Sequence, residues 1–259
     1  MNITYTSYLK INELLELQEL KSEPNEHDEM LFIIIHQTYE LWFKQILHEF
    51  DKLRLELESG HTWTSVKTLR RVLTIMKTLV SQVDILETMT PLEFNSFRSF
   101  LGQSTGFQSI QFRELEIVCG LRLPMMLSAH EGDAKTINLL KRRMDETTLW
   151  ESFGMYLTKK GFPVQPKREN EIGLLFNPSE EIQQQLIKVM KTDPEAALLS
   201  ELFVDFDEGL QEWRYRHVKM VERTIGRKKG TGGSDGVAYL QKTISHAIFP
   251  DLWAIRTEF

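Results

Sequence analysis

The sequence has little of what marks secreted, membrane-spanning or nucleic-acid-binding proteins. It holds one cysteine, Cys119, so no disulfide can form within the chain, and this usage is typical of a reducing cytoplasm. The longest aliphatic and aromatic run, at residues 31–35, falls far below the ~18 apolar residues of a membrane span. The N-terminus lacks a basic stretch followed by an apolar core, so we expect no secretory signal. A net charge of −6 without a strongly basic block argues against nucleic acid as a partner.

Proline and glycine are also few, at eight and fourteen residues, and they cluster between segments of helical periodicity. No Ser/Gly/Pro linker, internal repeat or low-complexity tract divides the chain. Apolar residues are abundant, because 41% of the chain is hydrophobic and it includes fifteen Phe and five Trp. Such a chain can bury a substantial core. The sequence therefore predicts an all-α fold in which residues 1–259 form a single large helical domain, in the cytoplasm and without a membrane partner.

Amphipathic periodicity locates the expected helices. Apolar residues at three- and four-residue spacing predict a short helix between residues 6 and 20 and long helices over 26–58 and 64–89. Another long helix should begin at Asp193-Pro194 and continue through residue 217. Shorter helices are expected at 134–144, at 149–157 and, capped and polar, at 179–191. We place no chemistry between residues 121 and 192.

His217 lies on an apolar helical stripe one turn after Trp213. The stripe consists of Leu210, Trp213, His217, Met220, Val221 and Thr224. The solvent-facing side is expected to hold Arg214, Arg216, Lys219, Glu222 and Arg223. A lone imidazole in an apolar wall suits haem iron better than zinc, although a core histidine satisfied by one hydrogen bond would look the same.

A glycine-rich segment, GTGGSDG at residues 230–236, follows that helix. Its glycines allow the backbone to approach a ligand, and Thr231 adds a hydroxyl among free N–H groups. It does not match a nucleotide-binding loop, because no strand precedes it and the spacing of the Walker motif is absent. The G-x-G-x-x-G motif also fails, because Asp235 stands where its last glycine should be. A flexible surface turn is the alternative.

Two further pairs combine an aromatic ring with a polar group one helical turn away. His36 follows Phe32 on the apolar face of the helix at residues 26–58, and is either a ligand-binding imidazole or a satisfied core histidine. Arg98 follows Phe94 on a helix that Thr90-Pro91-Leu92-Glu93 should start, with Thr90 as N-cap and a capping box. Arg98 is either a bidentate partner for a carboxylate or a surface arginine lying over its neighbour.

Five ordered blocks of the sequence resemble the tryptophan 2,3-dioxygenase family. They are HDEMLFIIIHQTYELWFK at residues 27–44, LETMTPLEFNSFR at 86–98, STGFQSIQFRELE at 104–116, WRYRHVKMVERTIG with the glycine-rich segment at 213–236, and YL with FPDLW at 239–253. The short segment YTSYL at residues 5–9 also resembles the family. Thr105 stands where the family usually has Ser, and Asp235 stands where the family often has Ser. The added methyl group and the added charge both lie beside the expected pocket.

That resemblance implies a haem dioxygenase with its haem pocket between helices. His217 would be the axial ligand of the haem b iron, with Thr105 and Gly106 beside the cofactor. For L-tryptophan, His36 would face the indole N–H as the catalytic residue, and Phe32 and Phe94 would line the ring. Arg98 would bind the carboxylate and Thr231 the ammonium.

The resemblance also implies a homo-oligomer, most commonly a tetramer, in which the arm of residues 1–20 contacts a neighbouring subunit. Tyr5, Tyr8 and Leu9 would reach that subunit's active site. Ordinary packing of exposed aromatic residues is the alternative at these positions.

The reaction so implied inserts both atoms of O2 across the indole C2–C3 bond and gives N-formylkynurenine, the first step of the kynurenine pathway. A haem-binding sensor or carrier would need His217 but not Arg98, Phe32 or Thr231. A helical interaction protein would need none of them. Within the enzyme class, a substituted tryptophan is the alternative substrate.

Overall fold

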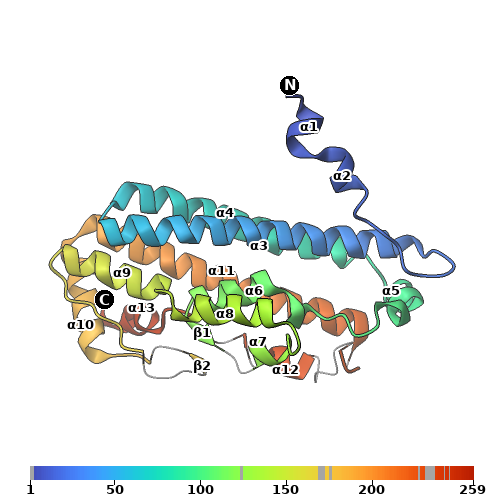
Figure 1. Cartoon of the computed structure of the whole chain (residues 1–259). Coiled ribbons are helices and arrows are strands. Elements are labelled where there is room, and N and C mark those ends of the chain that lie inside the picture. The colour runs from blue at the N-terminus through green and yellow to red at the C-terminus, as the bar shows by residue number, and fades with distance from the viewer. Residues whose placement is uncertain are drawn as a thin grey trace.

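The computed structural model describes residues 3–122, 125–168, 173–174, 177–226, 228–230, 237–241, 243–244 and 246–259. Helices dominate these residues (Figure 1), and within them no helix is long and apolar enough to span a membrane. Two strands of two residues each, β1 (Leu121–Arg122) and β2 (Gly173–Leu174), pair in antiparallel register. The prediction of an all-α fold is confirmed.

Three long helices lie side by side along the molecule (Figure 1): α3 (His27–Ser59), α4 (Thr62–Leu86) and α11 (Pro194–Ile225). Their facing stripes form the core, in which Phe50, Leu53, Leu69, Phe203 and Phe206 are fully buried. Burial of each such side chain stabilises the fold by about 1.5–3 kcal/mol. The core therefore fixes how these helices lie relative to one another.

Shorter elements surround this bundle. They are α5 (Pro91–Phe97), η1 (Arg98–Leu101), η2 (Gly106–Gln108), α6 (Ile110–Val118), α7 (Met125–Ser128), α8 (Ala134–Asp145), α9 (Leu149–Lys159), α10 (Glu180–Thr192), α12 (Val237–Gln241), α13 (Pro250–Ala254) and η3 (Ile255–Glu258). Helix α9 contributes to the core, and α5 lies at the end of the bundle where α3 begins (Figure 1).

Two predicted helix starts are confirmed by their capping bonds. The Thr90 hydroxyl accepts from the Glu93 N–H, and the Glu93 carboxylate accepts from the Thr90 N–H at 2.7 Å. The Asp193 carboxylate accepts from the N–H groups of Glu195 and Ala196, with Pro194 at the first helical position. Both satisfy backbone donors that a helix start leaves free.

Other boundaries differ from the sequence predictions. The single short helix expected over residues 6–20 is two helices, α1 (Tyr5–Leu9) and α2 (Ile11–Leu15), because Lys10 takes a left-handed conformation with φ of 54°. The helix expected to reach residue 89 ends at Leu86. Ser179 precedes α10 without a side-chain capping bond, and its N–H donates to Asp251 instead.

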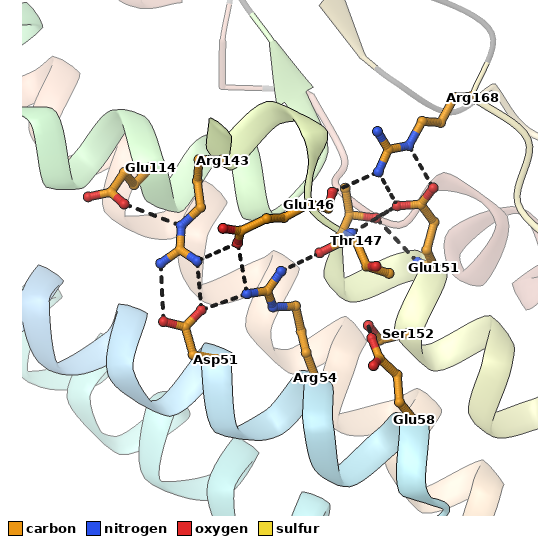
Figure 2. A network of polar contacts seen from close by, with 11 residues as sticks. Asp51, Arg54, Glu58, Glu114, Arg143, Glu146, Thr147, Glu151, Ser152 and Arg168 are labelled. Carbon is orange, nitrogen blue, oxygen red and sulfur yellow. Dashed lines mark hydrogen bonds and ion pairs between the residues drawn. The ribbon is translucent and has the colours of Figure 1, made fainter. Parts of the chain in front are cut away.

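An ionic network joins α3, α6 and α8 (Figure 2). The Arg143 guanidinium lies 2.8 Å from Asp51, 2.7 Å from Glu146 and 3.2 Å from Glu114. Arg54 lies 2.8 Å from the same Asp51 carboxylate and 3.1 Å from Glu146. Burial raises the pKa of Glu114, although the nearby positive charge of Arg143 acts to lower it. The network fixes α6, whose other face reaches the candidate site.

Candidate active site

A cavity of about 580 Å³ lies at the end of the bundle where α3 begins and α4 and α11 end. Residues of α3, α4, α5, α6 and α11 line it, together with the turns at 101–109 and with Gly230, Leu240 and Thr243. This volume is within the ~300–1,000 Å³ typical of small-molecule and cofactor sites.

The walls are largely aromatic. Phe32 lies 5.8 Å from Phe94, measured between ring centroids, and Phe112 lies 5.1 Å from Trp213. Phe43 belongs to the second group, because its ring is 5.3 Å from that of Phe112 and 6.2 Å from that of Trp213. These rings come from four different helices. They form an apolar enclosure suited to a flat ligand.

His217 presents a neutral imidazole to the cavity. Its ring stacks on Trp213, with centroids 5.3 Å apart and an angle of 3° between the planes. Burial, together with a smaller contribution from the nearby His36, lowers the pKa of His217 to about 4. No described residue forms a hydrogen bond with the His217 ring. A neutral imidazole with a free ring nitrogen is the form in which histidine binds a metal.

His36 is held in one tautomer by its own helix. Its Nδ1 lies 2.7 Å from the carbonyl oxygen of Phe32. A carbonyl can only accept, so Nδ1 carries the hydrogen and Nε2 is left as an acceptor. Burial lowers the pKa of His36, while the bond to Phe32 and the charge of Glu40 act in the opposite direction. The side chain is reachable by solvent through the cavity, but the surrounding protein still disfavours its charged form.

Three buried charged residues also line the cavity: Arg113, Glu116 and Arg214. The sequence did not predict that they belong to it. Arg113 lies 2.8 Å from Glu116, and Arg214 donates to the carbonyl oxygens of Thr243 and His246 at 3.3 and 3.0 Å. The prediction that Arg214 faces solvent is therefore wrong. The segment that follows α12 packs over this face of α11, and helical periodicity does not reveal such a tertiary contact.

This charged end of the cavity has an excess of positive charge, because two arginines accompany one carboxylate. Arg113 Nε and Arg214 Nη2 are buried, and neither has a hydrogen-bond partner among the described residues. Unpaired buried donors of this kind destabilise a protein by about 1–3 kcal/mol each. An anionic group on a ligand would satisfy them.

A further carboxylate, Glu40, lies one turn after His36 and also lines the cavity. Gln111 donates one hydrogen bond to the Glu40 carbonyl at 2.8 Å and another to its carboxylate at 2.9 Å. Glu40 and Gln111 both fall within the sequence blocks that resemble a family. Nothing else in the sequence indicates that Glu40 and Gln111 belong to the site.

Six of the predicted site residues lie together around the cavity: Phe32, His36, Phe94, Thr105, Gly106 and His217. The Thr105 hydroxyl accepts from the Phe107 N–H and caps η2, so the extra methyl group relative to serine sits on a residue that shapes the turn.

The other predicted residues are placed differently. Arg98 lies outside the lining and donates to the carbonyl oxygen of Lys229 at 2.7 Å, next to Gly230, which does line the cavity. Tyr5, Tyr8 and Leu9 are exposed on the projecting arm. Thr231, like Asp235, lies outside the described residues.

The histidines, cysteine and carboxylates of the described residues form no group of three or more that could hold a metal ion. The single neutral imidazole of His217 in the cavity wall could serve as one ligand of a metal that brings its other ligands.

Comparison with known proteins gives a consistent match. A sequence model described as tryptophan 2,3-dioxygenase matches residues 1–140 and 183–259. The tryptophan 2,3-dioxygenase of Herpetosiphon aurantiacus is 52% identical over 259 residues, covering 99% of this chain and 98% of the relative. That of Anaeromyxobacter sp. strain K is 51% identical over 254 residues, covering 98% and 95%. That of Caulobacter vibrioides is 39% identical, covering 99% and 98%.

Proposed function

The chain belongs to the tryptophan 2,3-dioxygenase family and catalyses the oxidation of tryptophan by O2, and we propose that it does so with haem b ligated by His217. The observation that carries this proposal is the neutral imidazole of His217, without a protein partner, in the wall of an aromatic cavity. The product is N-formylkynurenine, in which both oxygen atoms of O2 have been added across the indole C2–C3 bond.

The residues of the cavity fit haem in two respects. The apolar enclosure suits the flat macrocycle. The buried Arg113 and Arg214 nitrogens, which have no partner among the described residues, can form charge-assisted hydrogen bonds with the haem carboxylates. When bound, haem supplies the oxygen chemistry, while the protein supplies ligation, orientation and exclusion of water. Thr105 and Gly106 would shape the turn beside the cofactor.

The substrate would be oriented by its two ends. The free Nε2 of His36 accepts the indole N–H, and Phe32 and Phe94 pack against the ring. Arg98 binds the carboxylate, and Thr231 the ammonium. The bond from Arg98 to Lys229 uses one of five guanidinium N–H groups, so others remain for a carboxylate. Fixing both ends of the substrate lowers the entropic part of the barrier.

We further propose a homotetramer in the cytoplasm, with the haem dioxygenase domain spanning residues 1–259. The arm carries Tyr5, Tyr8 and Leu9 at 76%, 74% and 43% exposure, and no residue of α1 or α2 is buried. Apolar side chains so exposed are suited to cover a neighbouring subunit's pocket. The single cysteine is free and buried, as suits a reducing compartment.

The test is a single-turnover reaction. L-Tryptophan is added without oxygen to the reduced, haem-loaded protein, O2 is then admitted, and the product is analysed by mass spectrometry. We expect a product heavier than tryptophan by two oxygen atoms. A haem absorption band without any product would favour a carrier or sensor, and no haem band at all would contradict the role of His217.

A further inference from the structure

The arm is attached to α3 at two points, and the first is a buried carboxylate. Glu29, in the first turn of α3, is 2% exposed. It accepts hydrogen bonds from the Lys21 N–H at 2.8 Å, the Ser22 N–H at 3.0 Å and the Ser22 hydroxyl at 2.6 Å. The Ser22 oxygen in turn accepts from the Glu26 N–H at the start of α3. Residues 21–22 are thus fastened to the helix that follows them.

The second point lies two turns further along α3. Gln37 donates through Nε2 to the Leu17 carbonyl oxygen at 3.0 Å. Its Oε1 accepts from Gln18 at 2.6 Å, and the same Gln18 nitrogen donates to the Leu14 carbonyl oxygen. The end of α2 is thereby joined to the surface of α3. Beyond these contacts α1 and α2 project away from the bundle (Figure 1).

The stretch of α3 between these two points also carries Phe32 and His36, which line the cavity. Gln37 directly follows His36 in the sequence. One part of α3 therefore presents two residues to its own cavity and fixes the root of the arm. We propose that Glu29 and Gln37 are positioning residues for tryptophan binding, which act by setting the direction in which the arm leaves toward a second copy of this chain.

The arm has few stabilising contacts of its own. Its two helices have five residues each and bury none of them, and helices so short are not stable alone in water. The attachment of the arm to α3 sets the direction in which the arm leaves the bundle. That direction determines the effective concentration of the arm at a neighbouring subunit's pocket. The inference rests on the proposed role of the arm as a cover for that pocket.

The experiment compares four haem-loaded proteins: the native chain, Gln37→Ala, a chain lacking residues 1–9, and the two changes combined. We expect Gln37→Ala to raise KM for tryptophan about three- to tenfold, the range for one or two hydrogen bonds that compete with water. The kcat and the ferrous haem spectrum should change little. In the chain lacking residues 1–9, the same substitution should have no further effect.

Gln45→Ala is the matched control, because Gln45 lies on the same helix and donates to Glu49 at 2.7 Å rather than to the arm. It should leave KM unchanged. Gln37→Glu should restore part of the native KM, since a carboxylate can accept from Gln18 but cannot donate to Leu17. Glu29→Gln gives a second, independent perturbation, and it too should raise KM only while residues 1–9 are present.

The outcomes separate the two levels of the proposal. If removing residues 1–9 leaves KM unchanged, the arm does not cover a pocket and the proposed function of the arm fails. If that deletion raises KM but Gln37→Ala and Glu29→Gln do not, only the positioning role fails. If Gln37→Ala raises KM equally with and without residues 1–9, Gln37 acts through the neighbouring His36 and the inference is wrong.

Discussion

The hydrogen bond that fixes the His36 tautomer gives a quantitative prediction for His36→Ala. With Nδ1–H donated to Phe32, only Nε2 can interact with the substrate, and it can only accept. A hydrogen bond between neutral groups contributes about 0.5–1.5 kcal/mol net. Its loss should lower kcat/KM for tryptophan about two- to thirteenfold. His36 would orient the substrate rather than bind the cofactor, so haem content should stay the same.

The protonation state of His36 adds a pH dependence with a definite sign. Protonation of Nε2 converts the acceptor into a donor that repels the indole N–H. The pKa of His36 is lowered from 6.5 by burial, so the neutral form persists below pH 6.5. Activity should therefore be full at neutral pH and fall only as the pH drops through a value below 6.5. This acid limb of kcat/KM should be missing in His36→Ala.

The assay compares tryptophan with 1-methyltryptophan, which lacks the indole N–H. We expect His36→Ala to slow the reaction of tryptophan and not to slow that of the methylated compound. Equal losses on both compounds would refute the hydrogen bond. Complete loss of haem from the variant would mean that the roles assigned to His36 and His217 are exchanged.

Three further predictions concern other parts of the site and the fold. His217→Ala should lose most of its haem while its far-ultraviolet circular dichroism stays helical, and an unchanged ferrous spectrum would exclude His217 as the axial ligand. Arg98→Ala should lower kcat/KM for tryptophan by roughly 30- to several-thousand-fold, from the ~2–5 kcal/mol cost of an unpaired buried carboxylate. Tryptamine, which has no carboxylate, should be little affected, and equal losses on both would show that Arg98 only supports the fold. Asp207→Ala should lower the free energy of unfolding by about 3 kcal/mol or more, because Asp207 is fully buried and accepts from the N–H groups of Ile248 and Phe249 and the Trp253 indole. An unchanged urea midpoint would contradict that role.

Local features of the fold were predictable from the sequence. The long helices follow from apolar spacing, and the starts at Thr90 and Asp193 follow from side chains that bond to backbone within three residues. Such interactions are encoded by neighbours in the chain. The break at Lys10 was not predictable in this way, because a non-glycine residue with positive φ has no strong sequence signature.

Residues brought together by tertiary contacts were harder to assign. Periodicity placed His217 in an apolar wall but put Arg214 on the solvent side. It could not show that Thr243 and His246 pack over that face of α11. The sequence blocks contain Arg113 and Glu116, yet only the fold shows that they meet Arg214 in one cavity. Resemblance to a family suggested which residues matter, while the structure supplies the chemistry of each.

The attachment of residues 248–253 to Asp207 has a consequence for the order in which the cavity forms during synthesis. Leu240 and Thr243 complete the cavity wall, and the chain that follows them is fastened to α11 through Asp207. Proteins are made from the N-terminus at about 5–20 residues per second, and their early parts can fold first. The wall is nonetheless complete only when residues 248–253 have packed against α11, where Ile248, Phe249 and Trp253 donate to Asp207. A ligand that needs this wall could therefore bind only after residues 248–253 have been synthesised and have packed against α11.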